Sequence, residues 1–351
     1  MITKYPKFWM SIKPNTLRVK SLYSTINTDI KKLKKAYPDL KLSTIYFTVG
    51  SFRTNGTIQG DKILIGSELS LADRNTIIDE LPDWRKPFYK TQNPINEIAL
   101  LCTHEYVHTQ QKELVENLLS MCLYEGVAEF ISCKVTGKKS VSPAIAFGKA
   151  NQKIVVNKFV SDMYTMKNNY NWIWGENRNE LKIRDLGYYI GYEICERYYN
   201  QSTDKQNAIK ELIDLDYNNE KEIERIVDRA NLLPKVIEAL YNDYERQRPK
   251  VVSLSPFGNG SQNVKAGVMQ ISINFSDEMD INFRGFDYGP LGEEHIYKFR
   301  KLIGWSNNNK TITIEVEIEP NKQYQALITS SFKSKNGDIL KPYLIEFRTS
   351  K

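Results

Sequence analysis

The sequence predicts an α+β protein, in which a mainly helical part with a small sheet precedes an all-β part. Two observations support this class. Apolar residues recur with the helical period through most of residues 1–248, apart from strand-like stretches at 44–52 and 57–65. After Arg248 and Pro249 the period changes from 3.6 to 2, as in strands with one buried face. We therefore expect two domains, 1–248 and 249–351, because 351 residues are enough for two cores.

The helical part begins with an expected helix at residues 17–36, which ends before Pro38. The two strand-like stretches follow, and Thr54-Asn55-Gly56 between them is typical of a hairpin. Further helices are expected at 71–80, 95–111, 114–135, 143–163, 186–199, 205–213, 220–230 and 233–246. Asn93-Pro94 is a typical start for the helix at 95–111, and Gly137 would end the helix at 114–135.

Residues 249–351 contain runs in which apolar and polar residues alternate. Turn residues at 276–280, 307–310 and 336–338 separate these runs. Such spacing predicts an antiparallel β-sandwich. The alternating apolar positions are Ile271, Ile273 and Phe275, then Ile312, Ile314, Val316 and Ile318, and finally Tyr343, Ile345 and Phe347.

The composition is ordinary for a soluble globular protein, with 41% hydrophobic and 26% charged residues. The net charge of +7 is mild, and the lysine cluster at 31–35 is typical of a solvated helix face, so we expect no nucleic-acid partner. No apolar run is long enough for a transmembrane helix, and the N-terminus lacks a signal-peptide pattern. The four cysteines form no C-x-x-C pair and are expected to be buried free thiols.

The strongest functional feature is the string His-Glu-Tyr-Val-His at residues 104–108. Positions i and i+4 share a helix face, so His104 and His108 could present two imidazole nitrogens to one Zn²⁺, with Glu105 beside them as general base. A single histidine on an apolar face is usually a core residue. This chain has only three histidines, however, and two of them flank an acid at this spacing. The string therefore predicts a zinc site.

The expected helix at 114–135 would complete this site. Its apolar run is interrupted by Glu125 and Glu129, which lie one turn apart. Catalytic zinc normally has three protein ligands, so Glu125 is the expected third. Glu129 could accept the free ring N–H of a ligand histidine. Glu116 or Glu129 could replace Glu125 as the ligand, and Cys122 is a less favoured substitute.

His-Glu-Tyr-Val-His, followed after sixteen residues by Glu-Gly-Val-Ala-Glu-Phe, resembles the gluzincin metallopeptidases, the class that contains thermolysin and the zinc aminopeptidases. The resemblance implies one zinc ion, a strand at 62–67 along the substrate cleft, and a zincin-like catalytic domain over 1–248. No Gly-x-Met-Glu-Asn string is present to bind a substrate amino terminus, which argues against exopeptidase action, although the choice between endo- and exopeptidase stays open. The implied residues are His104, His108 and Glu125 as ligands, Glu105 as base, and Glu129 as the partner of a ligand histidine.

Hydrolysis of an amide also needs a donor for the oxyanion that develops on the carbonyl oxygen. The best local candidates are Tyr188 and then Tyr192, which share a face in the expected helix at 186–199. Either tyrosine could equally be a core residue. Gly187 and Gly191, one turn apart, would let another backbone approach closely. His295 lies in the other expected domain and has no expected catalytic role.

The strings Ile-Ser-Ile-Asn-Phe-Ser-Asp-Glu-Met-Asp and Pro-Asn-Lys-Gln-Tyr, with a closing Phe-Arg-Thr, make residues 249–351 resemble a bacterial Ig-like domain. Such modules are usually found in exported or cell-surface proteins as spacers or adhesion units. The resemblance implies a cell-surface partner and an extracytoplasmic location (periplasmic, surface-anchored or secreted), with the export signal outside this chain. A cytoplasmic location stays open.

The expected function is that of a zinc-dependent peptidase, which hydrolyses peptide or protein substrates with Glu105 as general base. Two alternatives stay open. The first is a surface binding or adhesion protein with a vestigial metal site. The second is a zinc hydrolase of a non-peptide amide, such as a cell-wall fragment.

Overall fold

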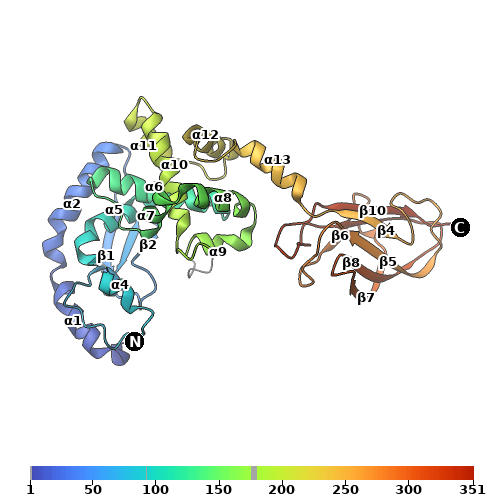
Figure 1. The fold of residues 1–351 in the computed structure, drawn as a ribbon, viewed down its shortest axis with the longest axis horizontal. Helices are drawn as coiled ribbons and strands as arrows, with labels where there is room; N and C mark the ends of the chain where they lie inside the picture. The colour runs from blue at the N-terminus through green and yellow to red at the C-terminus, as the bar shows by residue number, and fades with distance from the viewer. Residues whose placement is uncertain (1, 92, 175–179) are drawn as a thin grey trace. The chain divides into compact units, whose positions relative to one another are not determined.

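The structure, a computed structural model, describes residues 2–91, 93–174 and 180–351, and Figure 1 labels its elements. The chain forms two compact units, residues 1–237 and 238–351. Helices dominate the first unit and strands the second, which confirms the α+β class.

The first unit is built from helices around one small sheet. Several expected helices are confirmed: two have the expected bounds, at 205–213 and 220–230, and those at 95–111, 114–135 and 186–199 are close to expectation. The stretch 143–163 is two helices that meet at Asn151. The helices are α1 (Pro6–Leu17), α2 (Val19–Ala36), α3 (Ser67–Ser70), α4 (Lys86–Thr91), α5 (Ile98–His108), α6 (Leu118–Thr136), α7 (Pro143–Ala150), α8 (Gln152–Asp162), α9 (Asn169–Trp172), α10 (Leu186–Gln201), α11 (Lys205–Ile213), α12 (Glu220–Ala230) and α13 (Ile237–Gln247), the last at the boundary between the units.

Two helix predictions differ from the structure. The prediction of a helix at 71–80 is wrong: the structure has no helix there, because polar side chains bond to the local backbone instead. Asp73 N–H donates to Thr76 Oγ1 at 3.0 Å, and Asn75 N–H donates to Asp73 Oδ1 at 2.9 Å, which favours turns over a helix. The structure also adds α1, which sequence reasoning missed. Its internal Pro14 hides the helical pattern, although Phe8 and Ile12 pack one turn apart into the core.

The small sheet has the order β1-β3-β2, formed by β1 (Thr44–Thr48), β2 (Gly56–Gln59) and β3 (Lys62–Gly66). The hairpin predicted at 54–56 is wrong. The chain reverses at Gly60, whose φ of +59° lies in the left-handed region that glycine adopts without strain. β3 pairs with β1 in parallel and with β2 antiparallel, so both of its edges are used. It cannot border a cleft as an edge strand, because the edges of this sheet are β1 and β2.

Helices α5, α6 and α10 form the centre of the first unit, where Figure 1 shows α6 and α10 packed together. The expected close approach is confirmed at Gly191. A Cβ there would lie 1.7 Å from the carbonyl oxygen of Cys122 and 2.9 Å from the Cα of Gly126. α6 ends at Gly137, as expected, in the left-handed conformation with φ +76°. All four cysteines are buried and free, which confirms that expectation.

The second unit contains two antiparallel sheets that share one apolar core. One sheet has the order β4-β5-β8-β7 and the other the order β10-β9-β6. The alternating residues predicted to face inward are buried in this core, including Ile271, Ile314 and Phe347, except Tyr343, which is partly buried against it. The strands are β4 (Val251–Ser255), β5 (Gly267–Phe275), β6 (Phe286–Tyr288), β7 (Lys298–Ser306), β8 (Thr311–Ile318), β9 (Gln323–Ile328) and β10 (Tyr343–Arg348).

Candidate metal centre

The candidate site lies between α5 and α6, which pack against each other in the first unit. His104 and His108 project from α5, and Glu125 and Glu129 project from α6. The Asn117 side chain caps α6 by accepting the N–H of Ser120, which starts the helix at the right point to place both acids. All four site side chains are buried.

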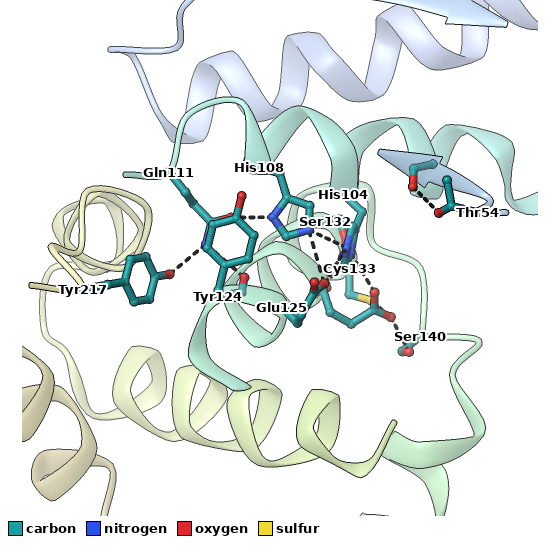
Figure 2. Close-up of polar contacts among 12 residues, drawn as sticks. Thr54, His104, His108, Gln111, Tyr124, Glu125, Ser132, Cys133, Ser140 and Tyr217 are labelled. Carbon is teal, nitrogen blue, oxygen red and sulfur yellow. Dashed lines mark hydrogen bonds and ion pairs between the residues drawn. The ribbon is translucent and has the colours of Figure 1, made fainter. Parts of the chain in front are cut away.

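Three potential ligand atoms converge at one point, as Figure 2 shows. The Nε2 atoms of His104 and His108 are 3.0 Å apart. Glu125 Oε2 lies 3.5 Å from the first and 3.3 Å from the second. Four tetrahedral ligands at about 2.0–2.1 Å from zinc would be about 3.3 Å from each other. The three side chains therefore fit a zinc ion, and they leave the fourth position of a tetrahedron open.

Hydrogen bonds outside the cluster determine the tautomer of His108. Gln111 Nε2 donates to the carbonyl oxygen of Tyr124 at 3.0 Å and to the Tyr217 hydroxyl at 3.0 Å. A carbonyl can only accept, so these bonds fix which end of the Gln111 amide is oxygen. That oxygen, Oε1, lies 2.7 Å from His108 Nδ1, which must therefore carry the proton. In the neutral ring, Nε2 is then a bare acceptor that faces the cluster.

His104 is held in the same way by a carboxylate. Its Nδ1 donates to Glu129 Oε2 at 3.0 Å, and the other oxygen of Glu129 accepts the Ser140 hydroxyl. In their neutral forms, both imidazoles would direct unprotonated Nε2 atoms at each other and at the Glu125 carboxylate. Three buried acceptors with no donor between them repel one another unless a cation or a proton joins them. This donor set is the chemical reason why the site suits a metal ion.

The electrostatics of the cluster also favour positive charge. Burial works against a charged His104, but hydrogen bonds to Glu125 and Glu129 outweigh it and raise the pKa of His104 to about 10. Burial alone would raise the pKa of Glu125, but the charges of His108 and His104 hold it well below its usual range. The two histidines therefore stabilise the carboxylate form that a metal ligand needs.

Glu105 lies on α5 beside the cluster, against strand β2. A Cβ added to Gly56 would lie 2.5 Å from Glu105 Oε1, so any other residue at position 56 would displace this carboxylate. Burial raises the pKa of Glu105 despite the opposing effect of His104 and His108. A carboxylate with a raised pKa is a better proton acceptor, as a general base must be.

The two candidate tyrosines lie in different surroundings. The Tyr188 ring stacks on His104 with centroids 6.4 Å apart and an angle of 16° between the planes. Burial raises its pKa strongly, and hydrogen bonding to Glu125 contributes. The Tyr192 hydroxyl instead donates to Glu196 at 3.3 Å, and its ring packs edge-on against Phe130. The structure therefore brings Tyr188 to the cluster but leaves Tyr192 bonded elsewhere.

The alternative ligands do not join the three converging atoms. Glu116 is exposed just before α6, and Glu129 is engaged with His104 Nδ1. The Cys122 sulfur faces α10, where a Cβ at Gly187 would meet it at 2.8 Å. In the second unit, His295 Nδ1 lies 2.9 Å from the backbone carbonyl of Gln323. Among the described residues, the cluster of at least three potential ligands consists of His104, His108 and Glu125.

Sequence reasoning missed three residues of this site. Gln111 follows His108 by three positions, and that helical spacing was a usable signal. Gly56 was assigned to a hairpin turn, whereas its role is to let Glu105 approach β2. Tyr124 also contacts the site, because its ring stacks on His108 at 4.5 Å with an angle of 14°. No pattern in the sequence distinguished it from the other tyrosines.

Comparison with known proteins links part of the chain to a family and provides little beyond it. No curated protein matches the chain. Two solved structures that align with it are a crystal structure of the S-layer protein rSbsC(31-844), at 11% identity, and a structure of surface layer protein SbsC, domains 1-6, at 12%. Each alignment covers 81% of this chain but only 44% of the other, with a TM-score of 0.23, which is too low to relate the folds. Residues 87–219, which contain α5, α6 and α10, match the family described as predicted Zn-dependent protease (DUF2268).

Proposed function

We propose that the protein is a zinc-dependent peptidase of gluzincin type, with its active site between α5 and α6. The observation that carries this proposal is the convergence of His104 Nε2, His108 Nε2 and Glu125 Oε2 at separations of 3.0–3.5 Å. Glu105 lies beside these atoms with a raised pKa. The match of residues 87–219 to a predicted Zn-dependent protease family supports the same activity.

The chain's own residues have distinct roles in this chemistry. A zinc ion held there would supply Lewis acidity, which polarises a carbonyl and makes water more acidic. Glu105 would accept a proton from the attacking water and pass it to the leaving amine. Tyr188 keeps its proton because burial raises its pKa, so its hydroxyl could donate to the developing oxyanion. Glu129 and Gln111 would hold the two imidazoles in the ligating tautomer.

The position of β2 favours a peptide over other amides as substrate. β2 pairs with β3 on one side, and within the described residues no strand pairs with its other side. Gly56, at the start of β2, lies against Glu105. An extended peptide that pairs with this edge would pass its backbone directly by the base. The cleft strand suggested by the resemblance is therefore reassigned from 62–67 to β2.

The metal requirement is tested first, by elemental analysis of purified protein. Wild-type protein should bind about one zinc per chain, as expected for a single site with three protein ligands. His104→Ala and His108→Ala should each abolish tight binding. Glu105→Gln should retain the metal, because Glu105 is not part of the ligand cluster, and lose hydrolysis. A folded wild-type protein that takes up no zinc would refute the proposal.

The substrate is tested with a mixed peptide library and with purified peptidoglycan in parallel. We expect cleavage of internal peptide bonds that a chelator stops and added zinc restores. Release of cell-wall fragments with intact peptides would indicate the non-peptide hydrolase instead. Zinc binding with both substrates intact would indicate a vestigial site in a binding protein. Glu105→Gln is the control for contaminating peptidases, because it should keep zinc but lose activity.

We also propose that residues 249–351 are a bacterial Ig-like module and that the protein acts outside the cytoplasm, where it contacts a cell-surface partner. The two antiparallel sheets around one core support the first part. The resemblance of the strand sequences supports the second. Fractionation of producing cells tests the location. Recovery of all the protein with cytoplasmic markers would contradict it.

A further inference from the structure

Helix α1 presents two different apolar faces. Phe8 and Ile12 are buried against the core of the first unit. On the opposite side, Met10 and Leu17 are 67% and 73% exposed. At about 100° per residue, Met10 and Leu17 lie within about 20° of each other, on a stripe completed by Pro6 and Pro14. A helix that already packs one face on its own core still leaves a second apolar stripe in water.

Basic residues border this stripe on both sides. Lys13 lies about 60° to one side of Met10, and Lys7 and Arg18 lie about 60–80° to the other. All three are exposed. This is the arrangement of helices that lie in a lipid interface, where apolar side chains enter the acyl boundary and flanking lysines reach the headgroups. Figure 1 shows α1, in blue, at the periphery of the first unit.

The N-terminal segment that contains this helix is strongly basic. Residues 1–28 contain no acidic residue. Residues 1–41 contain nine lysines and one arginine against two aspartates, a net charge of +8, whereas the whole chain carries +7 and residues 42–351 therefore carry −1. The Glu80 carboxylate lies close to α1, but it is bound at the N-terminus of this helix, where it accepts the N–H groups of Lys7 and Phe8. The complementary surface is therefore anionic.

We propose that the outer face of α1 docks the protein on an anionic lipid surface, with Met10 and Leu17 inserted between the headgroups. The apolar stripe favours lipid over a nucleic acid, because exposed Met and Leu side chains do not contribute to phosphate binding. A shallow apolar hollow extends the surface and is lined by Pro6, Lys7, Met10, Ser11 and Ile77. Docking of this kind is peripheral and reversible.

Vesicle co-sedimentation of the full chain tests this proposal. Wild-type protein should bind vesicles with 30% phosphatidylglycerol and not pure phosphatidylcholine vesicles, and about 0.5 M salt should weaken binding because it screens the charges. Lys7→Glu/Lys13→Glu should lower the partition coefficient by about ten-fold or more. Met10→Ser/Leu17→Ser should lower it by about ten-fold without a change in charge.

Helix α8 offers a matched control. Lys153 is exposed and Ile154 is 57% exposed, so Lys153→Glu/Ile154→Ser makes the same kinds of change elsewhere on the first unit. This variant should bind with at least half of the wild-type partition coefficient. Thermal unfolding of each variant should match wild type, because all the changed side chains are exposed.

A site-specific fluorophore reports the insertion itself. All four native cysteines are buried and free, so Leu17→Cys can be labelled selectively in the folded protein. An environment-sensitive dye at Leu17→Cys should shift to the blue on anionic vesicles, and the same dye at Ile154→Cys should not. Equal binding to neutral vesicles, no binding to anionic ones, or binding that Met10→Ser/Leu17→Ser leaves intact would overturn the proposal. If Met10→Ser/Leu17→Ser left vesicle binding intact and the protein also bound RNA tightly, the ligand would be a soluble polyanion.

Discussion

Gln111 provides a direct test of the proposed zinc site, because it touches the cluster only through His108. Its Oε1 accepts from His108 Nδ1 at 2.7 Å, and its amide nitrogen is held by the Tyr124 carbonyl and the Tyr217 hydroxyl. Gln111→Leu keeps a similar volume and removes all three hydrogen bonds. His108 would then be free to rotate or to protonate Nε2, and either change competes with metal binding.

The expected magnitude follows from the number of bonds lost. Loss of a partner that orients a ligand histidine typically lowers metal affinity about 10–100-fold, which is about 1.4–2.7 kcal/mol. The metal-free protein should lose about 1–3 kcal/mol of unfolding free energy, because buried partners are left without hydrogen bonds. Tyr217→Phe removes one bond but leaves the Tyr124 carbonyl to orient the amide. Its zinc affinity should fall less than three-fold.

The assay is a competition titration with a zinc chelator at fixed pH, together with denaturant unfolding of the metal-free protein. Gln110→Leu is the matched control, one residue away. The Gln110 side chain bonds to the Lys41 backbone and to Thr109, and not to either histidine. Its two bonds to Lys41 are exposed, so Gln110→Leu should reduce stability less than Gln111→Leu and leave zinc affinity unchanged. The reasoning would be refuted if Gln111→Leu bound zinc as tightly as wild type, or if Gln111→Leu and Gln110→Leu lost the same amount of zinc affinity.

Three further predictions concern other parts of the first unit. Gly56→Ala should retain zinc but lower kcat/KM by about 100-fold, measured with a peptide substrate, because its Cβ displaces the Glu105 carboxylate. Gly191→Ala should reduce the unfolding free energy by about 3 kcal/mol or more in a denaturant titration, because its Cβ would lie 1.7 Å from a backbone oxygen of α6. Gly258→Ala is the control and should be neutral in the same titration, because a Cβ at Gly258 would meet nothing within 4 Å. Burial raises the pKa of Asp185 from 3.8 to about 6. Between pH 3.8 and about pH 6 the folded chain therefore binds more protons than the unfolded chain, so the stability that this group contributes falls as the pH rises through this range. Asp185→Asn should remove that fall, so that the variant gains on wild type from pH 4 to pH 7 in unfolding titrations; an unchanged difference would contradict the assignment.

Local sequence patterns predicted the helices of the site well. A period of 3.6 with Gly137 as terminator located α6, and the spacing of His104 and His108 placed both rings on one face of α5. These features depend on residues three or four positions apart, and such neighbours meet in any α-helix whatever surrounds it. The prediction at 71–80 failed for a related reason, because the Asp73 and Thr76 side chains accept local backbone N–H groups in bonds that compete with a helix.

Strand order was beyond the reach of such patterns. The run at 57–65 alternates as one strand would, but the chain turns at Gly60 and β1 pairs in parallel with β3. Pairing of this kind joins segments that are separated by a loop, and period 2 is the same for a central and an edge strand. The assignment of the cleft strand to 62–67 was wrong for this reason.

The sequence by itself determined which side chains are available for a zinc site: two histidines one turn apart, an acid between them, and two further acids one turn apart on the next long helix. Only the tertiary structure decided that Glu125 faces both Nε2 atoms while Glu129 bonds Nδ1 of His104, that Gln111 sets the tautomer of His108, and that Gly56 makes room for Glu105. Helical spacing specifies a face, but the rotation and approach of two packed helices depend on contacts between residues far apart in the chain. The close crossing of α6 and α10 at Gly126 and Gly191 is one of these contacts.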